Sequence, residues 1–226
     1  MSYSWDYSVI LANYDILLRG MGITLMLTAV TVILGFGMGC LIAAMRISKV
    51  WIISWCARLY IEVFRGLPVL VTLIWLYFCL PIFLGSSISI SSFWVAVLGL
   101  GLNFSALQAE ITRSGFEAIP TGEIEAARGL DFNRWQILRY IIIPQAFWRS
   151  LTPTLGQAVN TLKLTALASS IVVPELFYET SALIQQTYRP LELYTTLAFL
   201  YLALIIPLSL VLQTLEARLA ARFRND

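Results

Sequence analysis

Apolar and polar positions follow one another along this chain in long blocks, and the blocks predict helices that cross a lipid bilayer. Residues 20–45, 66–109 and 193–215 carry no charged side chain. A helix of residues 20–45 is about 39 Å long, which exceeds the roughly 30 Å of a hydrocarbon core. The block 66–109 is too long for one span. It is interrupted at residues 84–92, where glycine and serines predict a turn.

We therefore expect an all-α membrane protein with five transmembrane helices, at about 20–45, 66–84, 93–112, 146–173 and 193–215. Composition agrees, because 59% of the residues are hydrophobic and only 12% are charged. Two regions follow. Residues 1–19, rich in aromatic side chains, form an extracytoplasmic segment at the membrane interface, and residues 20–226 form the transmembrane domain.

Lysine and arginine predict the orientation of the spans. If the polar stretch 121–144 lies inside the cell, 12 of the 15 basic residues are cytoplasmic. Arg19 and Arg189 then lie outside, and Lys163 lies within a span. Because positive residues favour the cytoplasmic side, the N-terminus is expected outside and the C-terminus in the cytoplasm.

The polar stretch 121–144 predicts two short helices joined by a turn. Thr121 is the expected N-cap of the first helix. Residues 129–132, Gly-Leu-Asp-Phe, end that helix, and Asn133 with Gln136 three positions later predicts a capping box for the second. A compact charged insert between two spans fits docking to a soluble partner. The alternative is a helix-containing loop that only faces solvent.

The sequence lacks the residue patterns that a metal site, a disulfide framework, ATP binding or catalysis would need. The chain has no histidine, and Cys40, Cys56 and Cys79 lie in apolar surroundings without a CxxC pair, so neither a zinc site nor a disulfide framework is expected. It has no GxxxxGK[ST] motif to bind ATP, and no nucleophile–base pair. We expect a non-catalytic protein without cofactors. A net charge of +2 gives no reason to expect nucleic acid.

Within the polar stretch, Glu125-Ala126-Ala127 is followed at a fixed distance by Ile141-Ile142-Ile143-Pro144. This pattern resembles the EAA loop of ABC importer permeases. Two positions depart from the usual pattern. Asp131 stands where glycine is expected, and Ile143 replaces leucine. Aspartate can adopt the left-handed conformation that glycine would supply, so the turn is retained in principle.

Further stretches resemble the polar amino acid uptake family of these permeases, the histidine, glutamate, glutamine and arginine type. They are residues 60–68 (YIEVFRGLP), 109–115, 119–120, 144–146 and 189–194. The resemblance extends from about residue 16 to residue 220. Residues 163–167 read Lys-Leu-Thr-Ala-Leu where the family often has Lys-Asp-Ser/Thr-Ser-Leu, and Leu107 replaces a common tyrosine.

The resemblance implies a multi-pass permease of the bacterial inner membrane that carries a polar amino acid inward by alternating access. A separate ATP-binding subunit drives it through the 121–144 loop, and an extracytoplasmic substrate-binding protein delivers the amino acid. The second half of the pathway is another permease subunit, either identical or similar. The residues expected to couple the loop to the ATPase or to shape its turn are Glu125, Ala126, Ala127, Gly129, Asp131 and Phe132.

The substrate pathway rests on ionisable residues. Lys163 is expected near mid-membrane, where a charge is costly and suggests function, and Asn160 lies one turn away. The alternative is a permanent ion pair of Lys163 with Glu110 or Glu62. Glu110 and Arg113 either contact substrate or form a structural i, i+3 pair. Four further residues are expected outside, where they meet a binding protein or form a solvated loop: Glu175, Glu179, Arg189 and Glu192.

Other functions stay open at this level. The transported molecule could be another small zwitterion, such as an opine or a compatible solute. A stand-alone secondary transporter or channel is less well supported, since it leaves the polar insert without a role. A membrane anchor or scaffold leaves Lys163 and Asn160 unexplained.

Overall fold

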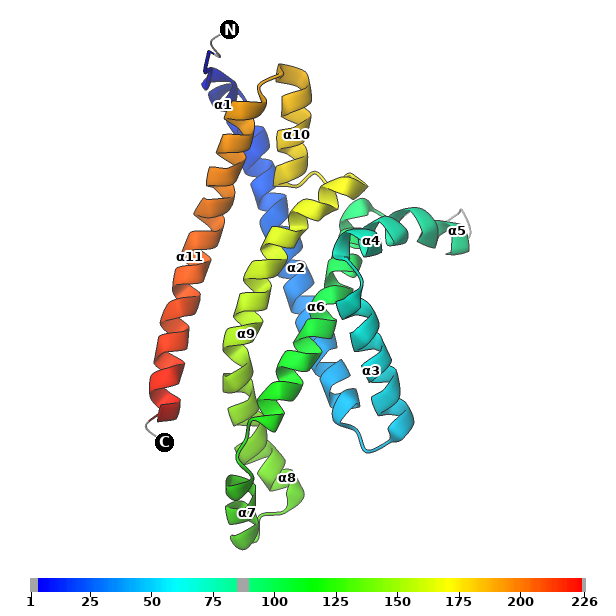
Figure 1. Cartoon of the computed structure of the whole chain (residues 1–226), viewed down its shortest axis with the longest axis vertical. Helices are drawn as coiled ribbons and strands as arrows, with labels where there is room; N and C mark the ends of the chain where they lie inside the picture. Colours follow the sequence, from blue (N-terminus) through cyan, green and yellow to red (C-terminus); the bar gives the residue numbers. More distant parts are fainter. Residues whose placement is uncertain (1–3, 85–89, 225–226) are drawn as a thin grey trace. The chain divides into compact units, whose positions relative to one another are not determined.

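The computed structural model describes residues 4–84 and 90–224, and all regular secondary structure in that part of the chain is helical (Figure 1). The predicted turn at 84–92 falls largely outside the described residues. The elements are α1 Ser8–Ala12, α2 Tyr14–Ile47, α3 Trp51–Gly66, α4 Val69–Ile74, η1 Trp75–Cys79, α5 Leu80–Leu84, α6 Ser92–Glu117, α7 Thr121–Gly129, α8 Arg134–Ile137, η2 Leu138–Ile142, α9 Ile143–Leu164, η3 Thr165–Ile171, α10 Leu176–Thr187 and α11 Pro190–Arg224.

Within the described residues, three helices are long and apolar enough to cross a membrane alone. They are Tyr14–Ile47, Ser92–Glu117 and Pro190–Ala217, and they contain the predicted spans 20–45, 93–112 and 193–215. Two bent helix pairs raise the number of candidate spans to as many as five. An all-helical membrane protein is thus confirmed, with three to five candidate spans.

The bent pairs correspond to the two less regular predictions. The second predicted span, 66–84, is joined to the helix Trp51–Gly66 through a bend of 103°. That helix was not predicted, because the exposed residues Arg58, Glu62 and Arg65 keep its sequence from forming an uncharged block. The fourth prediction, 146–173, falls in a helical run that begins at Arg134 and ends at Ile171, two residues before the predicted end, and that bends by 48° into Leu176–Thr187.

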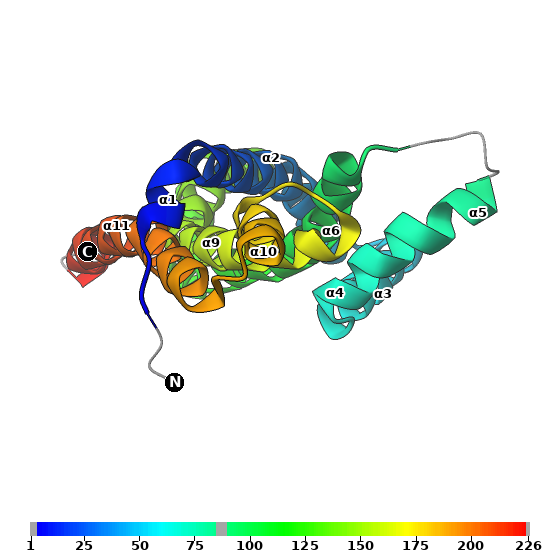
Figure 2. The same ribbon diagram turned by 90° about the horizontal axis from the view of Figure 1, so that it is seen from above.

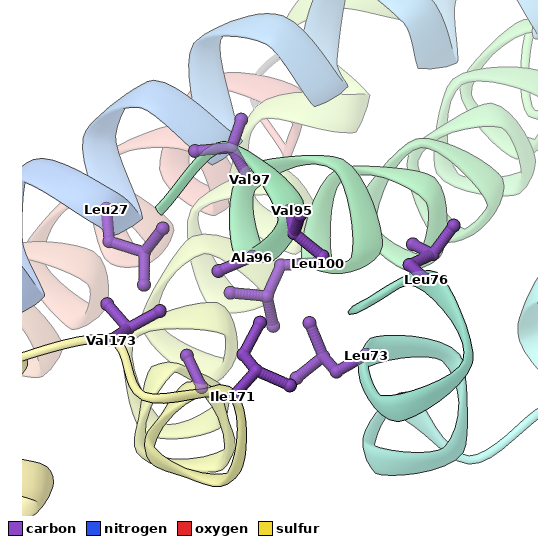
Figure 3. Packing of buried hydrophobic residues seen from close by; sticks show 10 residues of the cluster. Leu27, Leu73, Leu76, Val95, Ala96, Val97, Leu100, Ile171 and Val173 are labelled. Atoms are coloured by element: carbon purple, nitrogen blue, oxygen red, sulfur yellow. The ribbon is translucent and has the colours of Figure 1, made fainter. Parts of the chain in front are cut away.

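The chain forms two compact units. Unit 1 comprises residues 1–34, 67–102 and 158–209, and unit 2 comprises Gly35–Gly66, Asn103–Gln157 and Leu210–Asp226. Unit 1 has two apolar clusters. The first joins Leu27 of α2, Leu73 of α4 and Leu100 of α6 to Ile171 and Val173 around the end of η3 (Figure 3).

The second cluster of unit 1 fixes α10. Leu176 and Leu183 of α10 pack with Leu17 of α2 and with Leu193 and Leu197 of α11. In Figures 1 and 2, α10 accordingly lies beside the first turns of α2 and α11. Burial of these leucines stabilises the arrangement, at roughly 1.5–3 kcal/mol for each fully buried side chain.

Small residues set the approach of α2 to α6 within unit 2. A Cβ atom on Gly35 would lie 2.7 Å from Cδ1 of Phe104, and one on Gly39 would lie 2.6 Å from Cβ of Gln108. Gly37 meets nothing within 4 Å. The close approach of α2 to α6 is thus carried by Gly35 and Gly39, four residues apart on one helix face.

Two helices contain a π turn at the same distance from a proline. Trp75–Cys79 ends two residues before Pro81, and Leu138–Ile142 ends two residues before Pro144. Proline has no N–H for the carbonyl four residues earlier, and its ring crowds that carbonyl. A wider i→i+5 turn relieves the conflict, so each helix continues through its proline.

Candidate functional site

The polar stretch forms a helical hairpin, α7 and α8, which lies beyond the ends of α6 and α9 in unit 2 (Figure 1). Its first boundary differs from the prediction. Thr121 is the first helical residue, and the N-cap is Pro120, with φ −60° and ψ 133°. The ring of Pro120 fixes only its φ, and the extended ψ keeps this residue outside the helix, while its carbonyl accepts from the N–H of Glu123 at 3.2 Å.

The end of α7 is built around Asp131. This residue has φ 58°, in the left-handed region. The N–H of Phe132 donates to the carbonyl of Ala127 at 3.1 Å, and the N–H of Asp131 donates to that of Arg128 at 3.0 Å. These two bonds define a Schellman motif, in which glycine is the usual left-handed residue. Asp131 therefore adopts the left-handed conformation expected of the glycine at this position.

The second helix begins as predicted. The N–H of Gln136 donates to Oδ1 of Asn133 at 2.9 Å, and the N–H of Asn133 donates to Oε1 of Gln136 at 2.8 Å. This reciprocal pair is the expected capping box. The hairpin is tied to the next helix as well, because the side chain of Gln145 in α9 donates to the carboxylate of Glu123.

The hairpin divides its residues between an inner and an outer side. Ala127 and Ile137 are buried, at 4% and 5% exposure. All five of the remaining residues predicted to serve coupling are exposed: Glu125, Ala126, Gly129, Asp131 and Phe132. Leu130 and Trp135 are also 73% and 65% exposed. An outer side with large apolar residues among charges is typical of a protein-binding surface.

Glu110 and Arg113 form an i, i+3 ion pair in α6. Nη2 of Arg113 lies 2.7 Å from Oε2 of Glu110, and Arg113 also contacts Glu117 one turn later. Glu110 lines a pocket of about 440 Å³ in unit 2, together with Arg65 and Arg149. The pocket is lined by two arginines and one carboxylate, and that carboxylate, Glu110, is already paired with Arg113. The pocket therefore carries an excess of positive charge.

Lys163 and Asn160 lie near the end of α9, and both side chains are exposed. The α-helix ends at Leu164, and a tighter 3₁₀ segment, η3, follows. Lys163 therefore precedes a change of helix type. Residues three apart lie on neighbouring parts of a helix face, so Asn160 and Lys163 point in similar directions.

Two of the acidic residues expected in a solvated loop are fully buried. Glu175 and Glu192 are each 0% exposed. The carboxylate of Glu175 caps α10, accepting from the N–H groups of Phe177 at 3.0 Å and Tyr178 at 2.7 Å. Glu192 accepts from the N–H of Asp6 at 2.9 Å. The solvated-loop interpretation is wrong for both residues, because each carboxylate satisfies backbone donors inside unit 1.

Sequence reasoning also missed a buried polar contact between α6 and α9 within unit 2. Gln108 is fully buried, and its Nε2 donates to Oγ1 of Thr154 in α9 at 2.9 Å. Nothing in the local pattern distinguishes Gln108 from a solvent-facing glutamine. Its only sequence signal is a polar side chain in a block without charges.

Comparison with known proteins identifies a family that this chain matches. Residues 32–225 match the family described as binding-protein-dependent transport system inner membrane component. The chain is 34% identical over 215 residues to the glutamine transport system permease protein GlnP of Escherichia coli (strain K12), covering 95% of this chain and 98% of the relative.

A second relative carries a different kind of substrate. The octopine transport system permease protein OccM of Rhizobium meliloti is 36% identical over 194 residues, covering 83% of this chain and 79% of the relative. Among solved structures, an amino acid ABC transporter crystallised with histidines matches with a TM-score of 0.90 and 34% identity, covering 96% of this chain and 100% of that chain.

Proposed function

We propose that this chain, which belongs to the family of binding-protein-dependent transport system inner membrane components, is the permease subunit of an ATP-driven importer of a polar amino acid. The family makes it a non-catalytic, multi-pass membrane subunit of an ABC transporter, as the sequence predicted. The observation that carries the proposal is an EAA-type sequence folded into a capped hairpin in a chain whose relatives serve amino acid uptake.

A polar amino acid is the favoured substrate. GlnP carries glutamine by name, and this chain matches nearly its whole length. An opine is the second candidate, since OccM serves octopine and is similarly close. Both molecules are zwitterions, with an ammonium and a carboxylate on one α-carbon. A compatible solute is a more distant alternative.

The proposed topology has five spans, with the N-terminus outside and the C-terminus in the cytoplasm. It divides the chain into an interfacial segment, residues 1–19, and a permease domain, residues 20–226. The uneven placement of lysine and arginine supports this orientation, because it puts 12 of the 15 basic residues on the cytoplasmic side. The two bent helix pairs supply the second and fourth spans.

In the proposed mechanism, the α7–α8 hairpin inserts into the ATP-binding subunit. Glu125 and Ala126 face outward and are available to that partner, whereas Ala127 packs inside the hairpin. Gly129, Asp131 and Phe132 form the turn. Two caps and the bond from Gln145 to Glu123 make the hairpin stiff, so that movement of the ATPase is passed to α9.

The remaining partners follow from the importer proposal. A second permease subunit, identical or similar, completes the pathway, and an extracytoplasmic binding protein delivers the substrate. Lys163 and Asn160 are proposed to line the pathway, since both side chains are exposed near the end of α9. Glu110 and Arg113 are proposed to border it beside the basic pocket of unit 2.

The test is uptake of labelled amino acids into liposomes that contain this chain, its candidate ATP-binding subunit and its candidate binding protein. Wild type is expected to require ATP. Glu125→Lys is expected to reduce uptake and ATPase stimulation about tenfold or more, the effect of about 1.4 kcal/mol of lost docking free energy. Glu216→Lys is the matched control, because Glu216 is exposed and lies outside the hairpin.

Two results would contradict the proposal. Uptake that persists without the ATP-binding subunit would favour the stand-alone transporter. Equal uptake by Glu125→Lys and Glu216→Lys would remove the coupling role of the hairpin. Competition by unlabelled glutamine, glutamate, histidine, arginine and octopine in the same assay then identifies the substrate.

A further inference from the structure

A polar pocket of about 280 Å³ lies within unit 1, between the end of η3 and α10. One wall holds Phe177, Ser181 and Gln185, which are spaced four residues apart and so share a face of α10. The other wall holds Ser169 and Ser170 of η3. None of the lining residues that the structure describes is charged.

The three serines present only hydrogen-bond acceptors to this pocket. Each hydroxyl donates its single proton to a backbone carbonyl three or four residues earlier in its own helix. The distances are 2.7 Å for Ser169, 2.7 Å for Ser170 and 2.8 Å for Ser181. A serine hydroxyl has one proton and two lone pairs, so the lone pairs remain for a ligand.

The aromatic residues favour the same kind of ligand. Phe177 and Tyr178 are half-buried in the wall of the pocket. The face of an aromatic ring is negative and attracts a cation within about 6 Å. Oxygen lone pairs and ring faces together suit a group that carries several N–H donors and a positive charge. Gln185 adds an amide that can donate to a neighbouring carboxylate.

We propose that this pocket binds the cationic group, ammonium or guanidinium, of the amino acid that the chain carries. This inference rests on the proposed importer function and adds a site to it. The cation has two possible sources, the α-ammonium that every amino acid has and the side chain of a basic amino acid. The carboxylate of the same molecule lies toward Gln185.

The test is protection of an introduced thiol by ligand. Ser170→Cys is placed in a chain that also carries Cys40→Ser, Cys56→Ser and Cys79→Ser, and the purified protein is held in lipid nanodiscs. The rate of modification by a neutral maleimide is measured with arginine, lysine, glutamine or N-acetylglutamine. The control is Gln186→Cys in the same background, because Gln186 is exposed on α10 and does not line the pocket.

Arginine is expected to slow the modification at position 170 by a factor of one plus its concentration over its Kd, about elevenfold at ten times Kd. N-acetylglutamine, which has no cation, is expected to leave the rate unchanged. Protection by glutamine and arginine alike identifies the α-ammonium as the bound group, and protection by arginine and lysine alone identifies the side chain. Adding Ser181→Ala should weaken protection, whereas Ser181→Thr, which keeps the acceptor, should preserve it.

The proposal is overturned if none of arginine, lysine and glutamine slows the modification more than N-acetylglutamine does, or if protection is equal at the control position. The experiment needs neither ATP nor the ATP-binding subunit. Missing protection alongside ATP-dependent uptake therefore removes the pocket and leaves the importer. Uptake of amino acids without ATP, alongside protection, removes the importer and leaves a cation site.

Discussion

The hydroxyl of Tyr201 in α11 donates a hydrogen bond of 3.2 Å to Oε2 of Glu175, the residue that caps α10. The carboxylate also accepts from two N–H groups at the start of α10 and is completely buried. One side chain thereby joins the turn after η3, the beginning of α10 and the middle of α11. A buried carboxylate with this many partners holds its helices in a single arrangement.

Loss of the Tyr201 hydroxyl should therefore weaken unit 1. Tyr201→Phe is expected to lower the free energy of unfolding by about 1 kcal/mol, the net value of one hydrogen bond. Glu175→Ala should cost more, because it also removes a helix cap worth about 1 kcal/mol. Unfolding by sodium dodecyl sulphate, followed by circular dichroism, measures both. Tyr194→Phe on the exposed side of α11 is the control, and a Tyr201→Phe midpoint equal to the control would refute the assignment.

The left-handed conformation of Asp131 predicts an order among its substitutions. Asp131→Gly should be tolerated, because glycine adopts φ 58° without strain. Asp131→Val should cost about 1–2 kcal/mol, because its branched Cβ collides with the backbone there. The reconstituted uptake assay, with membrane insertion monitored in parallel, compares the two variants. If Val and Gly at position 131 support equal uptake, the turn does not govern coupling.

The glycines of α2 provide an internally controlled test of helix packing. Gly39→Ala is expected to destabilise unit 2 by about 1–3 kcal/mol, because the new Cβ overlaps Gln108 in a closely packed contact. Gly37→Ala meets no neighbour and should be neutral or stabilising, by up to about 1 kcal/mol of helix propensity. Detergent unfolding of the two proteins measures the difference. Equal stability of the two variants would contradict the close approach of α2 and α6.

Glu110 and Arg113 either contact substrate or form a purely structural ion pair, and exchanging the two residues separates these interpretations. Arg113→Glu should impair insertion or uptake, because it places two carboxylates one turn apart. If the pair is structural, the exchanged double variant, Glu110→Arg with Arg113→Glu, restores most of the uptake. If Glu110 contacts substrate, the exchange restores stability and leaves uptake low. Thermal unfolding and uptake measured on the same preparations distinguish these outcomes.

Local features of the chain could be predicted from its sequence. The capping box of Asn133 and Gln136 depends only on two residues three positions apart. The helices over 20–45 and 193–215 were predictable because each stretch is long, apolar and free of charge. Thr121 was misassigned because Pro120 takes the N-cap position without a capping side chain, and Thr121 is the first helical residue.

Features that depend on distant residues could not be predicted. Glu175 and Glu192 look like loop residues until their partners from α11 and the N-terminal segment are in place. The same holds for the pocket between η3 and α10. Its serines offer hydrogen-bond acceptors only because each serine hydroxyl donates its proton to a backbone carbonyl of its own helix. The helix Trp51–Gly66 was obscured because its charged side chains fall among apolar ones.

The π turn at Leu138–Ile142 fixes the direction in which the α7–α8 hairpin faces. It inserts one residue into the helical run that joins α8 to α9, and one residue of an α-helix corresponds to a rotation of about 100°. The hairpin is thus turned by about a quarter of a circle from where an uninterrupted helix would hold it. Any change in chain length at this position would point the outer side of the hairpin away from its partner while leaving every residue of that side intact.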